Sequence, residues 1–394
     1  MKRVFLQFLV VIMFFAGLLT LKAQVRTQDS RVVTTALPFL RIAGDPRSAG
    51  MADMGVATSP DAWSQQWNPA KYSFMTREQA VGVAYTPYLG QLVNDIGIGQ
   101  LAYANRINEQ SAFAASLRYF GLGTIFITED GETGFEENPN EFILDGSYSL
   151  KLSDQFSMAV TGRFLRSDLR FQATDQDASA ASSFSVGISG YYQSEEVAIG
   201  DMYGRYRGGF NISNIGPKIS YDVGGREDFL PTNLGLGGGV DFYLNDGFSK
   251  IGVTAEFNKL LVPTPPIRED GDENMNGTPN EIIEGQDDDV SFFSGIFQSF
   301  GDAPGGFSEE LKEVTWALGA EYTYDDSFSL RTGYFNEADE KGGRKYLSLG
   351  AGFKFSEINV DLSYLFSTSR VRSPLEGTLR FGLTFNFGDE YLEY

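Results

Sequence analysis

The chain has 394 residues and a formal net charge of −21, with no histidine and no cysteine. It therefore cannot carry a Ser-His-Asp triad, a cysteine nucleophile or a typical zinc site, and the sequence predicts a non-enzymatic protein without a cofactor. The excess of acidic residues disfavours nucleic acid as a partner and favours basic partners or divalent cations.

The first 23 residues predict a cleaved export signal. Lys2 and Arg3 give a positive start, residues 4–21 are almost entirely apolar, and Ala23 is a candidate cleavage point. A membrane-anchoring helix is the alternative, which the short apolar run at the extreme N-terminus disfavours. No later segment has the roughly 20 apolar residues that a membrane helix needs. We therefore expect an exported protein without a lipid anchor on a cysteine, and the lipid-facing strands described below predict that it belongs in the bacterial outer membrane.

Residues 24–77 lack the alternation that is typical of strands. The stretch 47–62 is rich in small residues, and the aromatic residues Trp63 and Trp67 follow it. A periplasmic tail would be more polar and less aromatic, so the sequence predicts a compact hatch, or plug, folded into the mouth of a barrel. The hatch motif comprises Arg47, Gly50, Asn68, Pro69 and Ala70.

Residues 78–387 alternate between apolar and small or polar residues, which predicts a fourteen-stranded antiparallel transmembrane β-barrel. In the last strand the odd-numbered residues from Leu379 to Phe387 are apolar, and the even-numbered residues from Arg380 to Asn386 are small or polar. The strands are expected near residues 78–87, 95–105, 110–120, 141–152, 155–167, 182–193, 205–214, 232–244, 248–259, 313–324, 327–336, 344–355, 357–367 and 377–387.

Short and long connections alternate between these strands, as in outer-membrane barrels with short periplasmic turns and long extracellular loops. An even number of strands returns both ends to the periplasm, and residues 388–394 would form a short tail. The inward residues are mostly small and polar, with scattered charges at Arg163, Glu321, Arg331 and Lys354. The inward glycines either leave a pore, provide the seat of a plug, or relieve curvature in a tight barrel.

The longest connection, residues 260–312, is the candidate working loop because loops of this length are usually functional or disordered. It begins with a proline-stiffened rise over 260–267, continues as an acidic run over 269–289, and ends with the apolar segment 290–300. The last part predicts a short amphipathic helix that Gly301 ends. One face would carry Phe292, Phe293, Ile296, Phe297 and Phe300. These side chains either pack on the base of the loop or bind a partner protein.

The acidic run contains alternating oxygen-bearing residues that resemble a calcium-binding loop. The candidate ligands are Asp270, Asp272, Asn274 and Asn276. The register is imperfect, because a loop starting at Asp272 has Ile283 at its twelfth position. A solvated acidic loop is therefore favoured over a calcium site.

The hatch sequence resembles the FadL family of fourteen-stranded outer-membrane proteins, in which a Gly/Ala-rich run leads to an Asn-Pro-Ala motif before the first strand. Its segments 38–40, 45–51 and 67–72 are most similar to the PorV family, a FadL-like branch of the type IX secretion system of Bacteroidetes. The resemblance extends over the mature chain in strand number, hatch and the long loop after the ninth strand.

This resemblance implies that the protein docks on the large translocon barrel of the type IX system and binds the C-terminal signal domain of cargo. It further implies a shuttle that carries cargo to a sortase-type attachment complex at the cell surface, in contact with outer-membrane lipid. The alternative is a FadL-like transporter of hydrophobic molecules, which the small, polar inward residues disfavour because such a conduit needs an apolar cavity. A surface enzyme such as a lipid A deacylase would need a nucleophile or an acid–base pair that the sequence does not offer.

Overall fold

The structure is a computed structural model, and it describes residues 31–127, 135–169, 180–221, 225, 227–244, 248–269 and 281–391. These described residues belong to one compact unit, residues 31–394. Among them, no helix is both long and apolar enough to cross a membrane.

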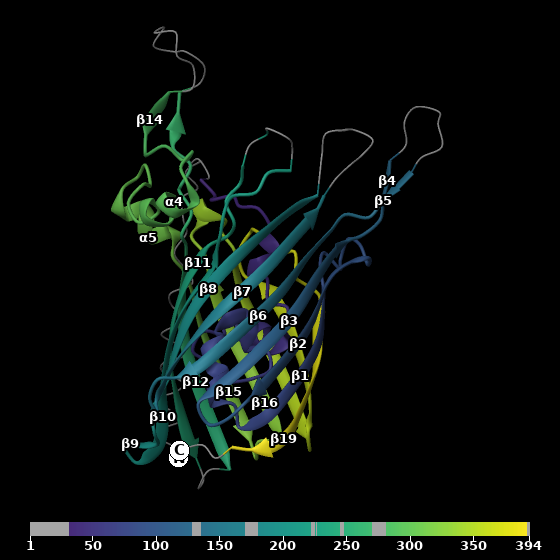
Figure 1. Ribbon diagram of the computed structural model, residues 1–394, viewed down its shortest axis with the longest axis vertical. Helices are drawn as coiled ribbons and strands as arrows, with labels where there is room; N and C mark the ends of the chain where they lie inside the picture. Colours follow the sequence, from purple (N-terminus) through teal and green to yellow (C-terminus); the bar gives the residue numbers. More distant parts are fainter. Residues whose placement is uncertain are drawn as a thin grey trace. The chain divides into compact units, whose positions relative to one another are not determined.

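Fourteen long antiparallel strands of the described residues form a closed barrel, which confirms the predicted fold class (Figure 1). Each strand pairs with its neighbour in the chain, and β19 returns to β1 to close the ring. The strands are β1 (Arg77–Pro87), β2 (Ile96–Arg106), β3 (Ser111–Leu122), β6 (Asn140–Lys151), β7 (Phe156–Asp168), β8 (Ala181–Gln193), β10 (Met202–Ile215), β11 (Asn233–Leu244), β12 (Ser249–Leu260), β15 (Thr315–Tyr324), β16 (Phe328–Asn336), β17 (Lys345–Phe355), β18 (Ile358–Ser367) and β19 (Leu379–Glu390).

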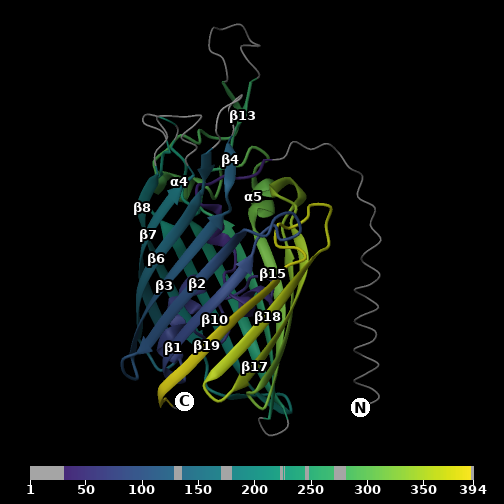
Figure 2. The same cartoon turned by 90° about the vertical axis from the view of Figure 1, so that its right-hand side faces the viewer.

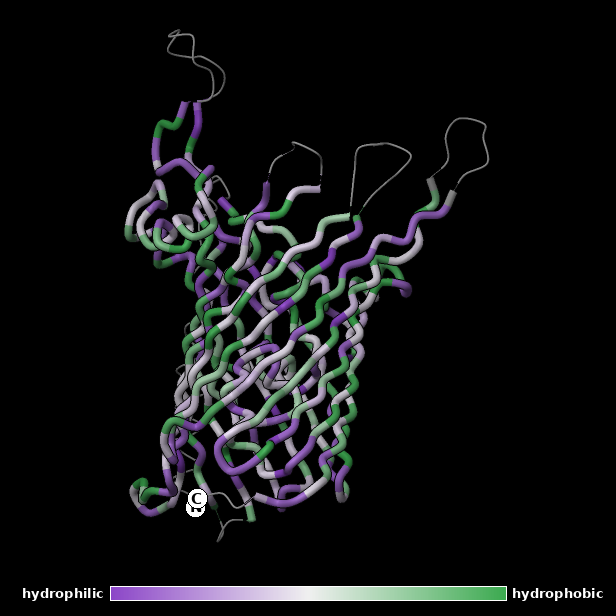
Figure 3. Tube along the Cα trace, viewed as in Figure 1, coloured by the Kyte–Doolittle hydropathy of each residue, from purple (hydrophilic) through white to green (hydrophobic). Residues whose placement is uncertain are grey.

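Alternating side chains place one set of residues outside the barrel and the other set inside. In β19, Arg380 is 1% exposed and points inward, whereas the adjacent Phe381 is 46% exposed on the outer face. Hydrophobic and hydrophilic positions follow one another along most strands (Figure 3). An outer wall of Leu, Val, Ile and Phe side chains is suited to the hydrocarbon core of a membrane, because moving apolar surface from water into hydrocarbon is favourable.

The connections differ at the two ends of the barrel, which we call the short-turn end and the long-loop end (Figures 1 and 2). Five further short strands lie within these connections. They are β4 (Ile125–Ile127), β5 (Phe135–Glu137), β9 (Val197–Ile199), β13 (Ile267–Arg268) and β14 (Ile282–Glu284). The strand β9 extends the sheet beside β10 at the short-turn end, and the other four form two hairpins at the long-loop end. Strand β19 continues to Glu390 and so includes the start of the expected tail.

Residues 31–76, which we call the lumenal segment, begin at the rim of the long-loop end, and most of residues 36–75 are buried inside the barrel (Figure 1). Short helical turns make up most of this segment: η2 (Pro38–Arg41), α2 (Pro46–Ala49), α3 (Ser64–Trp67) and η3 (Pro69–Phe74). Two inward glycines show how closely it approaches the wall. A Cβ at Gly350 of β17 would lie 3.0 Å from the Cα of Gly50, and one at Gly237 of β11 would lie 2.9 Å from the Cβ of Ala57. At these positions the missing side chain makes room for the lumenal segment.

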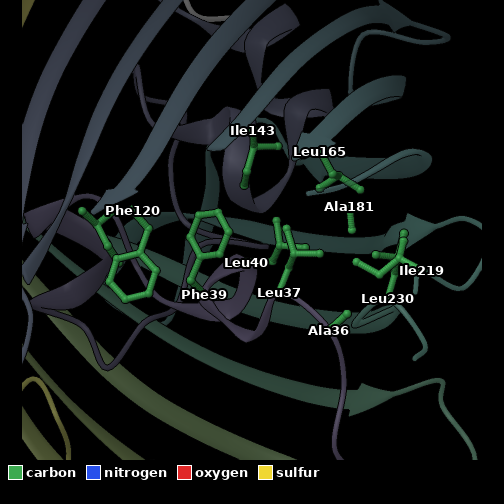
Figure 4. Packing of buried hydrophobic residues seen from close by; sticks show 11 residues of the cluster. Ala36, Leu37, Phe39, Leu40, Phe120, Ile143, Leu165, Ala181, Ile219 and Leu230 are labelled. Atoms are coloured by element: carbon green, nitrogen blue, oxygen red, sulfur yellow. The ribbon is translucent and has the colours of Figure 1, made fainter. Parts of the chain in front are cut away.

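A buried apolar cluster joins the lumenal segment to one side of the barrel near the long-loop end (Figure 4). Leu37, Phe39 and Leu40 of the lumenal segment pack among inward side chains of the wall. The rings of Phe39 and Phe120 stack with centroids 5.5 Å apart. The remaining members are Ala36, Ile98, Ile143, Leu165, Ala181, Ile219 and Leu230.

A buried network of ion pairs joins the lumenal segment to the opposite part of the wall. Arg47 contacts Asp61 at 2.5 Å and Glu321 of β15 at 2.9 Å. Arg331 of β16 contacts the same Glu321 at 2.5 Å and Asp361 of β18 at 2.5 Å. Because each charge has an opposite partner within hydrogen-bond reach, the network offsets the cost of burying five charged groups.

Candidate functional site

The candidate site is the long connection between β12 and β15, which folds into two short helices at the long-loop end. These are α4 (Phe292–Gln298) and α5 (Phe307–Glu313). They lie beside the upper edge of the barrel and project sideways from it (Figure 1). Lys259 shares the outer face of β12 with Val253 and Phe257, yet it is only 9% exposed, because acidic residues of α5 cover it. The loop therefore folds over the outer edge of the wall.

Helix α4 is the amphipathic helix expected over residues 290–300. Ser291 caps it, accepting a hydrogen bond from the backbone N–H of Ser294 through its side-chain oxygen at 3.2 Å. Its inner side lies against Phe229 and Pro263, since a Cβ at Gly295 would approach these residues at 2.8 and 3.0 Å.

The five apolar residues that were expected on one face of α4 divide between two environments. Phe292 and Ile296 are half-buried, whereas Phe293, Phe297 and Phe300 are exposed, with Phe297 at 66%. The rings of Phe293 and Phe297 meet edge to face, 5.3 Å apart. Two of the five side chains therefore pack on the base of the loop, and the other three are exposed to solvent, where a partner protein could reach them.

Helix α5 has its acidic side buried and its apolar side exposed. Glu309 and Glu310 are buried, while Phe307 is 77% exposed and Leu311 is also exposed. Sequence reasoning missed this helix. The sequence signal for it is that Phe307 and Leu311 are four residues apart and so share one side of a helix, whereas Glu309, Glu310 and Glu313 fall on the other side.

Three cations from distant parts of the chain hold the acidic side of α5. Arg31 comes from the lumenal segment, Lys259 from the end of β12, and Lys341 from the connection between β16 and β17. The ion pairs are Arg31–Glu309 at 2.7 Å, Lys259–Glu310 at 2.9 Å, Lys259–Glu313 at 2.7 Å, Lys341–Glu309 at 2.7 Å and Lys341–Glu313 at 2.8 Å. We call this group the ionic anchor. It fixes α5 with its apolar side turned to solvent.

The pKa values in the loop agree with a charged anchor at neutral pH. Burial acts to raise the pKa of Glu309, but hydrogen bonds from Arg31 and Lys341 outweigh it and lower the pKa to about 2. For Glu313, the hydrogen bonds from Lys259 and Lys341 likewise outweigh burial and lower the pKa. These glutamates remain ionised at any pH near neutrality.

We use the name aromatic face for the exposed apolar side chains of α4, α5 and the residue Phe300 between them. Large exposed apolar surfaces on proteins mark sites of interaction, and aromatic residues dominate the binding energy of protein interfaces. On both helices the apolar residues are held outward by contacts on the opposite side. The aromatic face comprises Phe293, Phe297, Phe300, Phe307 and Leu311.

The hatch motif residues lie in the lumenal segment and make contacts inside the barrel. Asn68 donates hydrogen bonds to the carbonyls of Val56 at 2.8 Å and Gly190 at 3.0 Å, and its Oδ1 accepts one from the N–H of Ala70 at 3.1 Å. Pro69 occupies the first position of η3, where its missing N–H is harmless. With Arg47 in the ion network and Gly50 against Gly350, all five residues hold the lumenal segment in place.

The candidate calcium ligands Asp270, Asp272, Asn274 and Asn276 lie outside the described residues. The hairpin of β13 and β14 flanks them, with Ile267 paired to Glu284. Within the part of the chain that the structure describes, no group of three or more acidic side chains is arranged to hold a metal ion.

Comparison with solved structures finds matches of low sequence identity that cover most of this chain. A FadL homologue of Pseudomonas aeruginosa is 15% identical, with 91% of this chain and 100% of that chain covered and a TM-score of 0.43. The toluene transporter TbuX of Ralstonia pickettii is 13% identical, with coverages of 87% and 98% and a TM-score of 0.47. The P. putida toluene transporter TodX is 12% identical, with coverages of 89% and 100% and a TM-score of 0.46. No match was found among curated proteins.

Comparison with protein families gives a direct match to the family described as type IX secretion system protein PorV. The match spans residues 25–267, which is more than half of the chain and includes the lumenal segment and the first nine barrel strands. It ends before α4 and α5, so the aromatic face is a feature of this chain that the match does not describe. The chain belongs to the PorV family of the type IX secretion system and is an outer-membrane β-barrel.

Proposed function

We propose that this barrel is a non-enzymatic carrier of type IX secretion. It docks on the large translocon barrel, binds the C-terminal signal domain of secreted cargo, and shuttles the cargo to the sortase-type attachment complex at the surface. Membership of the PorV family supports the assignment to this secretion system. The sideways position of α4 and α5 supports lateral docking, because a partner in the same membrane would meet them beside the wall (Figure 1).

The docking proposal rests on the orientation of α5, which turns its charged side toward the protein and its apolar side toward solvent, the reverse of a helix that packs on its own protein. Its glutamates point into the molecule, where the ionic anchor holds them, and Phe307 and Leu311 point out. A helix that served only to cover the barrel edge would bury the apolar side instead. The arrangement gains stability when a partner covers the aromatic face, since apolar area then leaves water.

Transport of hydrophobic molecules is the less favoured function. A conduit for such molecules needs a continuous apolar passage, and the lumen of this barrel contains the lumenal segment and a network of buried charges. The wall beside that network is polar, with Ser348, Ser363 and Thr384 turned inward. These features favour a closed barrel that works through its loops and outer surface.

Affinity purification from native outer membranes tests the proposal. A tagged form of the full chain is extracted in mild detergent, and the co-purifying proteins and lipids are identified by mass spectrometry. We expect the large translocon barrel and cargo C-terminal domains at above-background levels. Recovery of bound lipid alone, with neither protein partner, would contradict the carrier function and favour transport.

A further inference from the structure

A cavity of about 830 Å³ lies at the short-turn end of the barrel, the opposite end from α4 and α5 (Figure 1). Its lining comes from parts of the chain that are far apart in the sequence: the β2–β3 turn, the β6–β7 turn, the end of β8 and the end of β19. Phe74, the last residue of η3, reaches it from inside the barrel. In outer-membrane barrels the short turns face the periplasm, so this cavity opens toward periplasmic proteins.

The two basic residues that line this cavity, Arg106 and Lys151, are engaged by the barrel itself. Arg106 donates a hydrogen bond to the backbone carbonyl of Glu109 at 3.1 Å, and its guanidinium lies 4.1 Å from the centre of the Tyr391 ring. The ammonium of Lys151 lies 4.4 Å from the centre of the Phe74 ring. Aromatic rings stabilise cations placed over their faces, so both positive charges already have favourable contacts.

Three carboxylates around the same cavity have no cation partner within the described part of the chain. Glu109 belongs to the β2–β3 turn, Asp154 to the β6–β7 turn, and Glu195 follows β8. All three are exposed. A fourth acid, Glu390, lies 3.7 Å from Arg77. The lining of the cavity therefore has an excess of negative charge, which attracts a cationic occupant.

The cavity also presents apolar surface. Leu152 lines it and is 58% exposed, beside the rings of Phe74 and Tyr391. A metal ion or a polyamine would gain nothing from this surface, and among the residues with a described position no three acidic side chains converge to hold a metal ion. An occupant that carries both positive charge and an apolar side chain matches both properties of the lining.

We propose that this cavity is a docking site for a short basic segment of a periplasmic protein. Lysine or arginine side chains of that segment contact Glu109, Asp154 and Glu195, and an apolar side chain packs against Phe74 and Leu152. Cavities of about 300–1,000 Å³ take ligands of a drug's size, so this one accommodates a few residues and not a folded domain. The proposal is independent of docking at the aromatic face, because the two sites lie at opposite ends of the barrel.

Peptide binding to the full barrel in phosphatidylcholine nanodiscs tests the proposal. The probe is a short, fluorescently labelled peptide that carries several lysines around one phenylalanine, and its binding to empty nanodiscs is subtracted. We expect saturable binding that weakens at least about tenfold in the triple variant Glu109→Gln, Asp154→Asn, Glu195→Gln, because three attractive charges are lost. Alanine in place of the phenylalanine of the peptide should also weaken binding, and glutamates in place of its lysines should abolish it.

The matched control is the triple variant Asp325→Asn, Asp326→Asn, Glu357→Gln. These acids are exposed in turns at the same end of the barrel but do not line the cavity, so the control removes the same total charge. It should bind the peptide as the unchanged barrel does. No saturable binding, equal weakening in both triple variants, or no weakening in the cavity variant when it keeps the heat-modifiable mobility of a folded barrel would overturn the proposal. Spermidine binding as tight as that of the peptide would also overturn it, since the apolar surface would then contribute nothing.

Photo-cross-linking from position 152 in intact cells tests whether the occupant is a protein segment. The cross-linked peptide, identified by mass spectrometry, should come from a periplasmic protein and contain lysine or arginine residues. The cross-link should be lost when Glu109, Asp154 and Glu195 are neutralised and kept in the control variant. A cross-link to a neutral or acidic segment, or one that the cavity variant keeps, would contradict the proposal.

Discussion

Replacing Phe293 and Phe297 together by serine is expected to reduce association with the translocon barrel about 30-fold or more, while the barrel still assembles. Truncation of a central aromatic residue of an interface commonly costs about 2 kcal/mol, and the two rings contact each other at 5.3 Å. Both side chains are largely exposed, so the free protein loses little packing. The amount of translocon barrel recovered with the tagged chain measures the effect.

Phe126→Ser is the matched control for this experiment. Phe126 is another exposed phenylalanine at the long-loop end, but it belongs to β4 and not to the aromatic face. We expect it to leave recovery unchanged. Unaltered recovery of both the translocon barrel and the cargo domain with the double variant would show that the aromatic face is not the docking surface.

Replacing Arg47 by alanine is expected to destabilise the lumenal segment by about 3–5 kcal/mol, the usual effect of breaking a buried ion pair. Asp61 loses its 2.5 Å partner, and Glu321 keeps only Arg331. Trp63 and Trp67 lie in the same segment, so their fluorescence reports its unfolding during a denaturant titration. The denaturant concentration at the midpoint of unfolding should fall substantially. Arg47→Lys should give an intermediate midpoint, because lysine keeps the charge but lacks the planar guanidinium that forms paired hydrogen bonds.

The exposed pair Arg372–Glu376 provides the comparison. Its atoms lie 3.3 Å apart, but the arginine side chain is 76% exposed, so Arg372→Ala should change stability by less than about 1 kcal/mol. A wild-type midpoint for Arg47→Ala would mean that the ion network does not hold the lumenal segment, and that the apolar cluster around Phe39 suffices.

The barrel could be predicted from the sequence because a wall between lipid and a polar lumen imposes a two-residue period on every strand. All fourteen strands lie within three residues of their expected bounds. The largest deviations are at β10, which begins at Met202, and at β19, which continues to Glu390. Both occur at the short-turn end, where pairing continues without the alternation that marks the wall.

The site was harder to predict because its orientation depends on residues far away in the sequence. The period of α4 indicates a helix with an apolar side, but only contact with Phe229 and Pro263 decides which aromatic residues face solvent. For α5, seven residues give little periodic signal, and the ionic anchor that turns its glutamates inward uses Arg31 and Lys341. Sequence neighbours carry no information about such partners.

Site-specific photo-cross-linking in intact cells tests most directly the claim that the outward side of the long loop is where this barrel meets its translocon. A photoreactive amino acid replaces Phe297 in one strain and Phe126 in a second. The account predicts a cross-link to the large translocon barrel from position 297 and none from position 126. Cross-linking from 126 alone, or no protein cross-link from 297 in cells that still secrete cargo, would contradict it.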